Sequence, residues 1–363
     1  MSGSGSRVAV IPGDGIGMEV IPAALEVLDA AADTVGRPRL EATHLSWGCA
    51  YYAREGRMMP PDALDVLDEH DAILLGAIGS PEVPDHLAVW GLIMPIRQGF
   101  GQYVNLRPIK LLPGVQSPLR DRGPEDLDIV VVRENSEGEY ANVGGHVHRG
   151  HEEEVAVQTG VFSRKGIERI VEFAFATAER RPRRRVASAT KSNAWAYAMP
   201  LWDEVCLEVA ARHPDVELTK YHVDALAARF ATAPDSLDVV VASNLFGDIL
   251  SDLGAALAGS LGIAPSGNID PTRRHPSMFE PIHGSAPDIA GQGIANPFGA
   301  IWAGAMMLEH LGRDEEAALV VDALEWASSR PETRTPDLGG TGNTATVAAA
   351  VAARVAERTP SPA

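Results

Sequence analysis

The stretch "VVVASNLFGDILSDLG", residues 239–254, starts as an apolar strand and continues as a helix that carries carboxylates. A short apolar run is typical of a strand buried on both faces of a sheet. In the helix, Asp248 and Asp252 are four residues apart, so both side chains project from one face. A solvated surface would tolerate this pair. A buried strand, however, brings the start of its helix to a crevice at the sheet edge, where a cation would have to offset the repulsion.

The rest of the chain up to this stretch alternates between strand-like and helix-like segments. Apolar runs in "RVAVIP" (7–12) and "LDIVVVRE" (127–134) alternate with helical periodicity in "MEVIPAALEVLDAAAD" (18–33) and "GIERIVEFAFATAERR" (166–181). This alternation predicts an α/β protein. Beyond residue 254 the pattern predicts mostly helix, most clearly in "NPFGAIWAGAMMLEHLG" (296–312) and "DEEAALVVDALEWASS" (314–329).

Composition narrows the class of protein. The 363 residues are 45% hydrophobic and 22% charged, which is typical of a globular chain with two lobes or one large domain. A net charge of −18 argues against a nucleic-acid or anionic-membrane partner. The one basic run, Arg180 to Arg185, is interpreted as cations at a helix end. Only Cys49 and Cys206 occur, and no signal peptide or membrane-spanning run is recognised, so we expect a cytoplasmic protein.

Residues 144–163, "GGHVHRGHEEEVAVQTGVFS", interrupt the alternation. The pattern of "EVAVQTGVF" predicts an extended chain. His146, His148 and His151 could form a metal cluster, but the loop is glycine-rich and acidic and their spacing suits a strand face only in part. A solvated hairpin or a subunit-contacting arm is favoured over a metal site.

A divalent metal is one explanation for the carboxylates at 248 and 252. Mg²⁺ and Mn²⁺ are hard cations that prefer oxygen ligands. A further acid, Asp224, follows directly on the predicted strand "VELTKYHV". From this chemistry alone, a metal site and a solvated helix face remain equally open.

Several basic residues are candidates for binding an acidic substrate. Arg97, Arg107 and Arg133 have side chains suited to bidentate binding of carboxylates, although a single arginine near a strand end is commonly a surface residue. Lys191 stands out because the chain has only four lysines. Lysine can lose its proton and act as a base, whereas arginine cannot; chance in an arginine-rich chain is the alternative. Tyr140 lies in a glycine-containing loop shortly after Arg133.

A series of motifs resembles those of the metal-dependent β-decarboxylating dehydrogenases, the isocitrate and isopropylmalate dehydrogenase family. In order they are "IPGDGIGMEV", "LLGAIGSP", "NLRP", "RENSEGEY", "ATKSN", "SNLFGDILSDL", "EPIHGSAPDIAGQGIANP" and "PDLGGTGNT". Each motif alone is modest, but their order and spacing along nearly the whole chain are specific. The resemblance implies a two-lobed isopropylmalate dehydrogenase-like α/β fold, with a sheet flanked by helices, and not a Rossmann dinucleotide fold.

The resemblance also implies a domain division and residue roles. Residues 1–99 and 254–363 would form the larger, cofactor-binding lobe, and residues 100–253 the smaller lobe for substrate, metal and dimerisation. The implied roles are substrate binding by Arg97, Arg107 and Arg133, metal binding by Asp224, Asp248 and Asp252, general base for Lys191 and acid for Tyr140. Lys191 and Asp224 would come from the partner subunit of a homodimer, with the arm near 144–163 in its interface.

The cofactor expectation rests on the same resemblance. "GDGIG" is not G-x-G-x-x-G, and no dinucleotide fingerprint follows it. The family instead binds its cofactor along "HGSAPDIAG" and "GIAN". Asp288 would face the adenosine ribose and repel a 2′-phosphate, so NAD is expected. The implied contacts are His283, Gly284, Ser285, Ala286, Asp288 and Asn296.

The substrate is expected to be a malate-type 2-hydroxy acid. The isocitrate enzymes of this family share a serine and an asparagine shortly before the first substrate-binding arginine. Here these two positions are Gly91 and Ile93, so isocitrate is disfavoured. "RENSEGEYANVGG" looks closer to the tartrate and D-malate dehydrogenase branch, although Ile93, Met94 and Pro95 depart from the "LLK" of that branch. Isopropylmalate is the alternative substrate. A non-catalytic NAD- or hydroxy-acid-binding paralogue is less favoured because the base, acid and metal ligands are all present.

Overall fold

The structure is a computed structural model, and it describes residues 5–357. The chain forms two compact units: unit 1 comprises the residues up to Gln102, Lys110–Pro124 and the residues from Ala255 on, and unit 2 comprises Tyr103–Ile109 and Glu125–Gly254. The sequence-based division assigned 110–124 to the smaller lobe, whereas here the segment belongs to unit 1. Lys110 Nζ lies 2.6 Å from Glu325, and Ser117 Oγ donates to the Leu257 carbonyl at 2.6 Å.

The strands of unit 1 are ordered β2-β1-β3-β12-β11. Their bounds are β1 (Arg7–Gly13), β2 (Glu41–His44), β3 (Ala72–Ala77), β11 (Pro265–Ile269) and β12 (Ser277–Pro281). β1 pairs in parallel with β2 and β3, β3 pairs in parallel with β12, and β11 is antiparallel to β12. The carboxyl ends of β1, β3 and β12 therefore lie at one edge, and "GDGIG", "GSP" and "HGSAP" follow them there.

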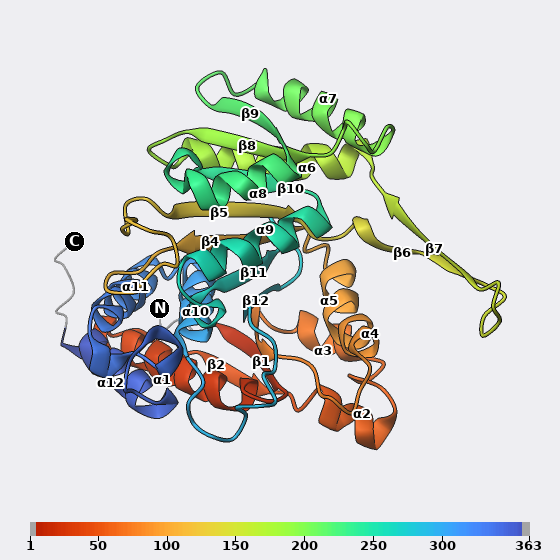
Figure 1. The fold of residues 1–363 in the computed structure, drawn as a ribbon. Helices are drawn as coiled ribbons and strands as arrows, with labels where there is room; N and C mark the ends of the chain where they lie inside the picture. Colours follow the sequence, from red (N-terminus) through yellow and green to blue (C-terminus); the bar gives the residue numbers. More distant parts are fainter. Residues whose placement is uncertain (1–4, 358–363) are drawn as a thin grey trace. The chain divides into compact units, whose positions relative to one another are not determined.

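Helices cover both faces of the unit 1 sheet. They are α1 (Gly17–Val35), α2 (Cys49–Glu55), α3 (Ala63–Asp68), α4 (Asp85–Ala88), α5 (Met94–Gly99), α10 (Phe298–His310), α11 (Asp314–Ser328) and α12 (Thr344–Ala356), with η1 (Val89–Ile93) between α4 and α5. One face, including Ile11, Ile73 and Leu75, packs against residues of α2–α5. On the other side, α1 and α11 pack against α10, and α12 packs against α1 and α11 (Figure 1). Because α10 is apolar all round, it is buried between its neighbours.

The expectation that the chain after residue 254 is mostly helical was incomplete. β11 and β12 lie in that part, and the short 3₁₀ segments η3 (Leu261–Ile263), η4 (Pro331–Thr333) and η5 (Pro336–Leu338) connect its elements. Both strands are short and carry no clear alternation, since almost every residue in them is buried. Periodicity alone does not distinguish such runs from a buried loop or helix.

The strands of unit 2 are ordered β4-β5-β10-β8-β9. They are β4 (Val104–Lys110), β5 (Asp128–Glu134), β8 (Arg185–Thr190), β9 (Glu217–His222) and β10 (Val239–Ala242), and the helices are α6 (Arg164–Glu179), α7 (Ala198–Ala210), α8 (Val223–Thr232) and α9 (Asn244–Leu257), with η2 (Pro234–Ser236) before β10. β5, β10, β8 and β9 pair in parallel. The motifs "NSEGEY", "NLFGD", "KSN" and the residue Asp224 follow these strands, so they share one edge of the sheet.

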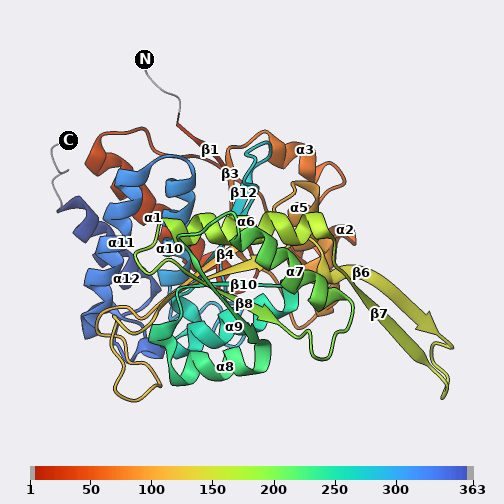
Figure 2. The ribbon, with the colours of Figure 1, turned by 90° about the horizontal axis from the view of Figure 1, so that it is seen from above.

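The expected arm is a separate two-stranded hairpin in unit 2. β6 (Gly138–Val147) and β7 (Val155–Val161) pair antiparallel and extend away from the sheet of the unit (Figures 1 and 2). Val143, Val147, Val155 and Val157 are each about half exposed. His146 pairs with Glu154 at 2.8 Å, and residues 5–357 contain no group of three or more side chains that could hold a metal ion.

The basic run after α6 has a more specific role than that of solvated cations at a helix end. Arg181 Nε lies 2.5 Å from Asp238, whose carboxylate is fully buried, and Arg183 lies 3.6 Å from the same carboxylate. Arg181 also pairs with Asp128 at 3.0 Å. These pairs hold the starts of β5 and β10 against the end of α6. Across residues 5–357, no helix combines the length and apolarity that crossing a bilayer would require.

Candidate active site

The carboxylates of α9 lie next to an arginine. Arg107, buried on β4, places Nη1 3.1 Å from Asp248 Oδ1, 3.3 Å from Asp252 Oδ1 and 2.7 Å from Ser251 Oγ. The side chains of Asp248 and Asp252 remain 31% and 53% exposed. Partial burial raises the pKa of Asp252 and the nearby Asp248 adds to this, while Arg107 opposes it. A guanidinium thus offsets the repulsion that the sequence predicts.

Asp248 also contacts two residues of the "RENSEGEY" motif. Arg133 on β5 donates from Nη1 to Asp248 Oδ1, and from Nε and Nη2 to Asn244 Oδ1 at 3.0 and 2.7 Å. The Tyr140 hydroxyl donates to Asp248 Oδ2 at 3.0 Å, and the Arg133 guanidinium lies 5.4 Å from the Tyr140 ring centroid. One carboxylate of α9 therefore joins two predicted substrate-binding arginines and the predicted acid.

The local sequence allows this close packing. A Cβ added to Gly247 would lie 2.6 Å from the Arg133 Cβ, so α9 can approach β5 only with glycine at this position. Glu139 accepts hydrogen bonds from Ser243 Oγ at 2.8 Å and from the Leu245 amide at 3.1 Å. A carboxylate at the start of α9 satisfies a free backbone donor and suits the positive end of the helix.

Lys191 and Asp224 form a second pair at the ends of β8 and β9. The Lys191 Nζ lies 2.6 Å from Asp224 Oδ1, and this hydrogen bond lowers the pKa of Asp224. The Asp224 side chain is 68% exposed. Within one chain Asp224 therefore contacts Lys191, and the described residues do not bring Asp224, Asp248 and Asp252 together as a three-carboxylate cluster.

Arg97 lies in unit 1, on α5. Its Nη2 lies 2.7 Å from Glu280 Oε1, and the two side chains are only 8% and 10% exposed. Asn268 Nδ2 donates to the same oxygen at 2.7 Å. The buried Nε atoms of Arg97 and Arg107 have no hydrogen-bond partner among the described residues. Both predicted substrate-binding arginines thus keep a buried donor available for a ligand.

The "GDGIG" motif packs against other loops of unit 1. The Asp14 carboxylate accepts from the Cys49 amide at 2.9 Å and the Gly79 amide at 3.0 Å, and the Ile16 amide donates to the Ser285 carbonyl at 2.9 Å. Gly15 has φ +54°, and a Cβ there would lie 2.0 Å from the Ser285 oxygen. Burial, together with Asp14, raises the pKa of Cys49 to about 12. The motif is an anchor for the "HGSAP" loop.

Glu19 on α1 fixes the far end of the same loop. Its carboxylate accepts from the Gly291 amide at 2.6 Å and the Gly293 amide at 2.9 Å. Both glycines have positive φ, 78° and 67°, which favours glycine over other residues. Ala286 in the loop also has φ +40°, an uncommon conformation for a residue with a side chain. The loop is therefore held in a strained shape by contacts at both ends.

The residues predicted to bind NAD lie on and next to this loop. The His283 Nε2 is buried without a partner among the described residues, and burial lowers the pKa of His283, which favours the neutral ring. The Asp288 carboxylate is exposed on the loop. Asn296 Nδ2 donates to Asp337 at 3.0 Å, and Asp337 lines a cavity of about 360 Å³. This part of unit 1 therefore offers a ligand two polar groups, the buried His283 Nε2 and the exposed Asp288 carboxylate.

The comparison with protein families now decides the classification. The family model described as isocitrate/isopropylmalate dehydrogenase matches residues 7–351. The chain belongs to this family. A D-malate dehydrogenase (decarboxylating) of Escherichia coli (strain K12) is 50% identical over 352 residues, which cover 95% of this chain and 97% of that protein. A tartrate dehydrogenase/decarboxylase of Pseudomonas putida is 50% identical over 353 residues, 95% and 96% of the two chains.

A further related sequence and a solved structure are also similar to this chain. A protein named as a probable tartrate dehydrogenase/decarboxylase of Agrobacterium vitis is 53% identical over 350 residues, 96% of this chain and 98% of that protein. The crystal structure of isocitrate dehydrogenase from Methylococcus capsulatus superposes with a TM-score of 0.88 at 34% identity and covers 97% of this chain and 99% of that one. The predicted family and α/β fold are confirmed, and the protein is an oxidoreductase of this family.

Several residues with contacts to the family motifs were not singled out from sequence. They are Asp14, Glu19, Glu139, Asn244, Glu280 and Asp337. Each stands inside or next to a motif that the sequence analysis quotes, and this position is the only signal that could have indicated them. Their partners are backbone amides or side chains far away in sequence, which a pattern of residues along the chain does not reveal.

Proposed function

We propose that the protein catalyses the NAD- and divalent-metal-dependent oxidative decarboxylation of a malate-type 2-hydroxy acid, D-malate or tartrate. The observation that carries the proposal is the array around Asp248, in which Arg107, Arg133 and Tyr140 contact one carboxylate. Two guanidiniums suit a dicarboxylate substrate, and a phenol beside them can transfer a proton. Relatives at 50–53% identity that are named for tartrate or D-malate support this choice of substrate.

The donor set on α9 suits a hard dication. Asp248 and Asp252 present partly exposed carboxylate oxygens on one helical face. They are two ligands, and Asp224 of the partner subunit would complete the set with Mg²⁺ or Mn²⁺. The exposed loop carboxylate of Asp288 and the orphaned Nε2 of His283 likewise suit the ribose and a polar group of NAD. When bound, the dication would offset negative charge on the substrate oxygens, and NAD would accept the hydride.

The chain's own residues would bind the substrate and move protons. Arg97, Arg107 and Arg133 would hold the two carboxylates of the malate moiety. Lys191 Nζ of the partner subunit would accept the proton of the 2-hydroxyl as hydride leaves, which yields a β-keto acid that loses CO₂. The Tyr140 hydroxyl would then donate a proton to the carbon that CO₂ has left.

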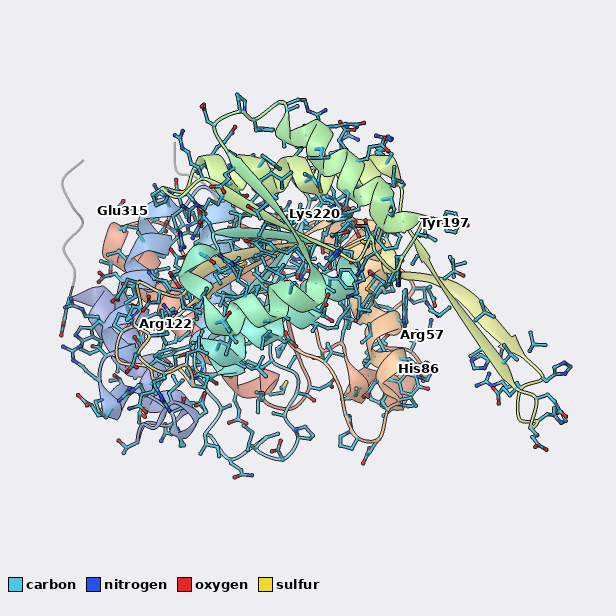
Figure 3. The ribbon with its side chains drawn as sticks, turned by 45° about the horizontal axis from the view of Figure 1, so that its top comes forward. Arg57, His86, Arg122, Tyr197, Lys220 and Glu315 are labelled. Carbon is cyan, nitrogen blue, oxygen red and sulfur yellow. The ribbon has the colours of Figure 1, made fainter. Side chains whose placement is uncertain are left out.

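A homodimer with shared sites follows from these roles. Asp224 and Lys191 contact each other in one chain, while Arg107, Arg133 and Tyr140 contact Asp248. Exposed apolar side chains support an interface in unit 2: the hairpin valines are about half exposed, and Tyr197, shortly after Lys191, is 93% exposed (Figure 3). Unit 1 would bind NAD, and unit 2 would dimerise. A cytoplasmic location stays a prediction.

NAD should be preferred over NADP because the exposed Asp288 carboxylate would repel a 2′-phosphate. Asp288→Lys should narrow the preference by about tenfold, since it removes a repulsion and adds an attraction. The ratio of kcat/KM values for NAD and NADP measures this. A wild-type enzyme that prefers NADP would contradict the assignment.

The substrate is tested with one assay of the purified chain. NADH formation with Mn²⁺ and NAD is followed for D-malate, L-tartrate, meso-tartrate and 3-isopropylmalate, and released CO₂ is measured in parallel. We expect the highest kcat/KM with D-malate or a tartrate. A clear preference for 3-isopropylmalate would establish the alternative. Absence of turnover with every acid, in a chain that still binds NADH, would favour the non-catalytic paralogue.

A further inference from the structure

A pocket of about 420 Å³ lies at the opposite edge of the unit 1 sheet from the cofactor loop. Ser6, Asp71 and Pro276 line it, and each immediately precedes one of the parallel strands β1, β3 and β12. The loops "GDGIG" and "HGSAP" follow the other ends of β1 and β12. The family's predicted chemistry makes no use of this amino-terminal edge, yet most of the pocket's lining residues are titratable.

The pocket contains two arginines that form no ion pair with a described residue. Arg273 and Arg274 are exposed at its wall, and neither guanidinium has a hydrogen bond or ion pair with any residue in the range 5–357. The two acids of the pocket are already engaged: Asp68 pairs with His275 at 2.7 Å, and Asp71 accepts from the Arg7 amide at 2.7 Å.

A histidine adds a neutral donor to the same pocket. His310 lines the pocket and has no hydrogen bond among the described residues. Burial, with Arg273 nearby, lowers the pKa of His310 to about 4, so its ring is neutral near pH 7 and can donate one N–H.

The loop that carries the arginines is pre-shaped. The buried Asp270 carboxylate accepts from the Thr272 amide at 2.9 Å, the Arg274 amide at 3.0 Å and the His275 amide at 3.2 Å. Arg273 has φ +54°, which turns the chain at the pocket wall. A ligand would therefore meet an ordered loop and would not have to bear the entropic cost of ordering it.

We propose that this pocket binds a small multivalent oxyanion, a phosphate or a polycarboxylate, through Arg273 and Arg274. Guanidinium groups donate in pairs to both kinds of anion, and the His310 N–H would donate a further hydrogen bond to the oxygens. The site is separate from the residues assigned to substrate, metal and NAD.

A short series of contacts links the pocket to Arg97. The His275 ring stacks on Phe100 at 5.3 Å, and Gln102 Nε2 donates to the Pro276 carbonyl at 2.7 Å; both partners follow α5, which carries Arg97. β12 runs from the pocket to Glu280, which holds the Arg97 guanidinium. Occupation of the pocket should therefore change the KM for the hydroxy acid, a consequence that rests on the proposed function.

Binding is tested without substrate. Calorimetric titrations with inorganic phosphate and with citrate, at constant ionic strength, should each show saturable binding with a Kd on the order of 1 mM. Arg273→Gln/Arg274→Gln should weaken it at least tenfold. The matched control is Arg57→Gln/Arg120→Gln, which changes the net charge equally at two exposed arginines of unit 1 outside the pocket; Figure 3 labels Arg57. Binding of phosphate alone would identify a phosphate ligand, and binding of citrate alone a polycarboxylate.

Nuclear magnetic resonance places the anion. The ring signals of His310, assigned with His310→Asn, should shift saturably with phosphate, and those of His86, which does not line the pocket and is labelled in Figure 3, should not. Equal affinity in the wild type and the arginine double variant, or uniform shifts of all histidines, would overturn the site. To test the coupling, the KM for the hydroxy acid is measured with and without phosphate. Phosphate should change this KM for the wild type but not for the arginine double variant. Chelation of Mn²⁺ by phosphate would affect both proteins equally, so the variant controls for it. Saturable binding without a KM change would retain the site and reject the coupling.

Discussion

The two regions that carry the predicted chemistry use carboxylates in opposite ways. In unit 2, the Asp248 carboxylate contacts the side chains of Arg107, Arg133 and Tyr140 and remains partly exposed. In unit 1, Asp14 and Glu19 accept hydrogen bonds from backbone amides and fix loops. Side-chain partners can be exchanged when a ligand arrives, whereas loss of an amide contact changes the course of the chain. We therefore expect substitutions in the first region to change catalysis and substitutions in the second to change the shape of a loop.

The largest effect on activity should come from the residues around Asp248 in unit 2. Asp248→Asn should reduce kcat by about 10³, because it removes a charge that the proposed dication and two arginines share. Circular dichroism should show an intact fold, and EDTA treatment of the wild type should abolish turnover reversibly. Asp215→Asn, at an exposed position of unit 2, is the matched control. Metal-free enzyme with full turnover would show that the metal assignment is wrong.

Variants of Lys191 test whether the active site is shared between subunits. Lys191→Met should lower oxidation by a factor on the order of 10² or more, and Lys191→Arg should fail too, since guanidinium stays protonated. Mixing inactive Lys191→Met with inactive Tyr140→Phe subunits should restore activity, because each heterodimer would contain one intact site. No recovery after confirmed subunit exchange would place base and acid in one subunit.

Substitutions that loosen the cofactor loop of unit 1 should change cofactor binding rather than the rate of turnover. Glu19→Gln should raise the KM for NAD about tenfold with little change in kcat, since a neutral amide oxygen is a weaker acceptor for the Gly291 and Gly293 amides. Glu26→Gln, exposed on the same helix, should leave both constants unchanged. Direct titration of NAD measured by fluorescence should show the same loss of affinity. A fall in kcat with unchanged NAD affinity would contradict a positioning role.

The smallest effect concerns stability at the surface of unit 2. His213 lies 2.7 Å from Glu179 and 2.8 Å from Glu172, and these contacts raise the pKa of His213. A raised pKa stabilises the fold below the unfolded pKa of about 6.5 and this stabilisation is lost as pH rises through the folded pKa. His213→Gln should therefore lower the free energy of unfolding, measured by denaturant titration, more at pH 6 than at pH 9, with a difference of about 1 kcal/mol or less. An equal loss at both pH values would show that packing, not charge, is responsible.

Much of the fold could be predicted because local patterns produce it. The strand at 239–242 and the helix after it, the parallel α/β alternation and the extended arm follow from apolar runs and periodicity. β11 and β12 escaped prediction because strands buried on both faces show no alternation. The division into units was also missed at 110–124, since contacts with Glu325 and Leu257 decide where that segment belongs.

The sequence by itself determined which residue types stand at the ends of the strands, and so the family and the candidate residues. Only the tertiary structure decided their partners. Arg97 pairs with Glu280 across 183 positions, and Arg107 meets Asp248 across 141. The order of strands in a sheet brings such residues together, and periodicity along the chain fixes the face of each element but not its neighbour. The same reason explains why Glu19 was overlooked: its partners are backbone amides, which every residue other than proline offers and no sequence pattern distinguishes.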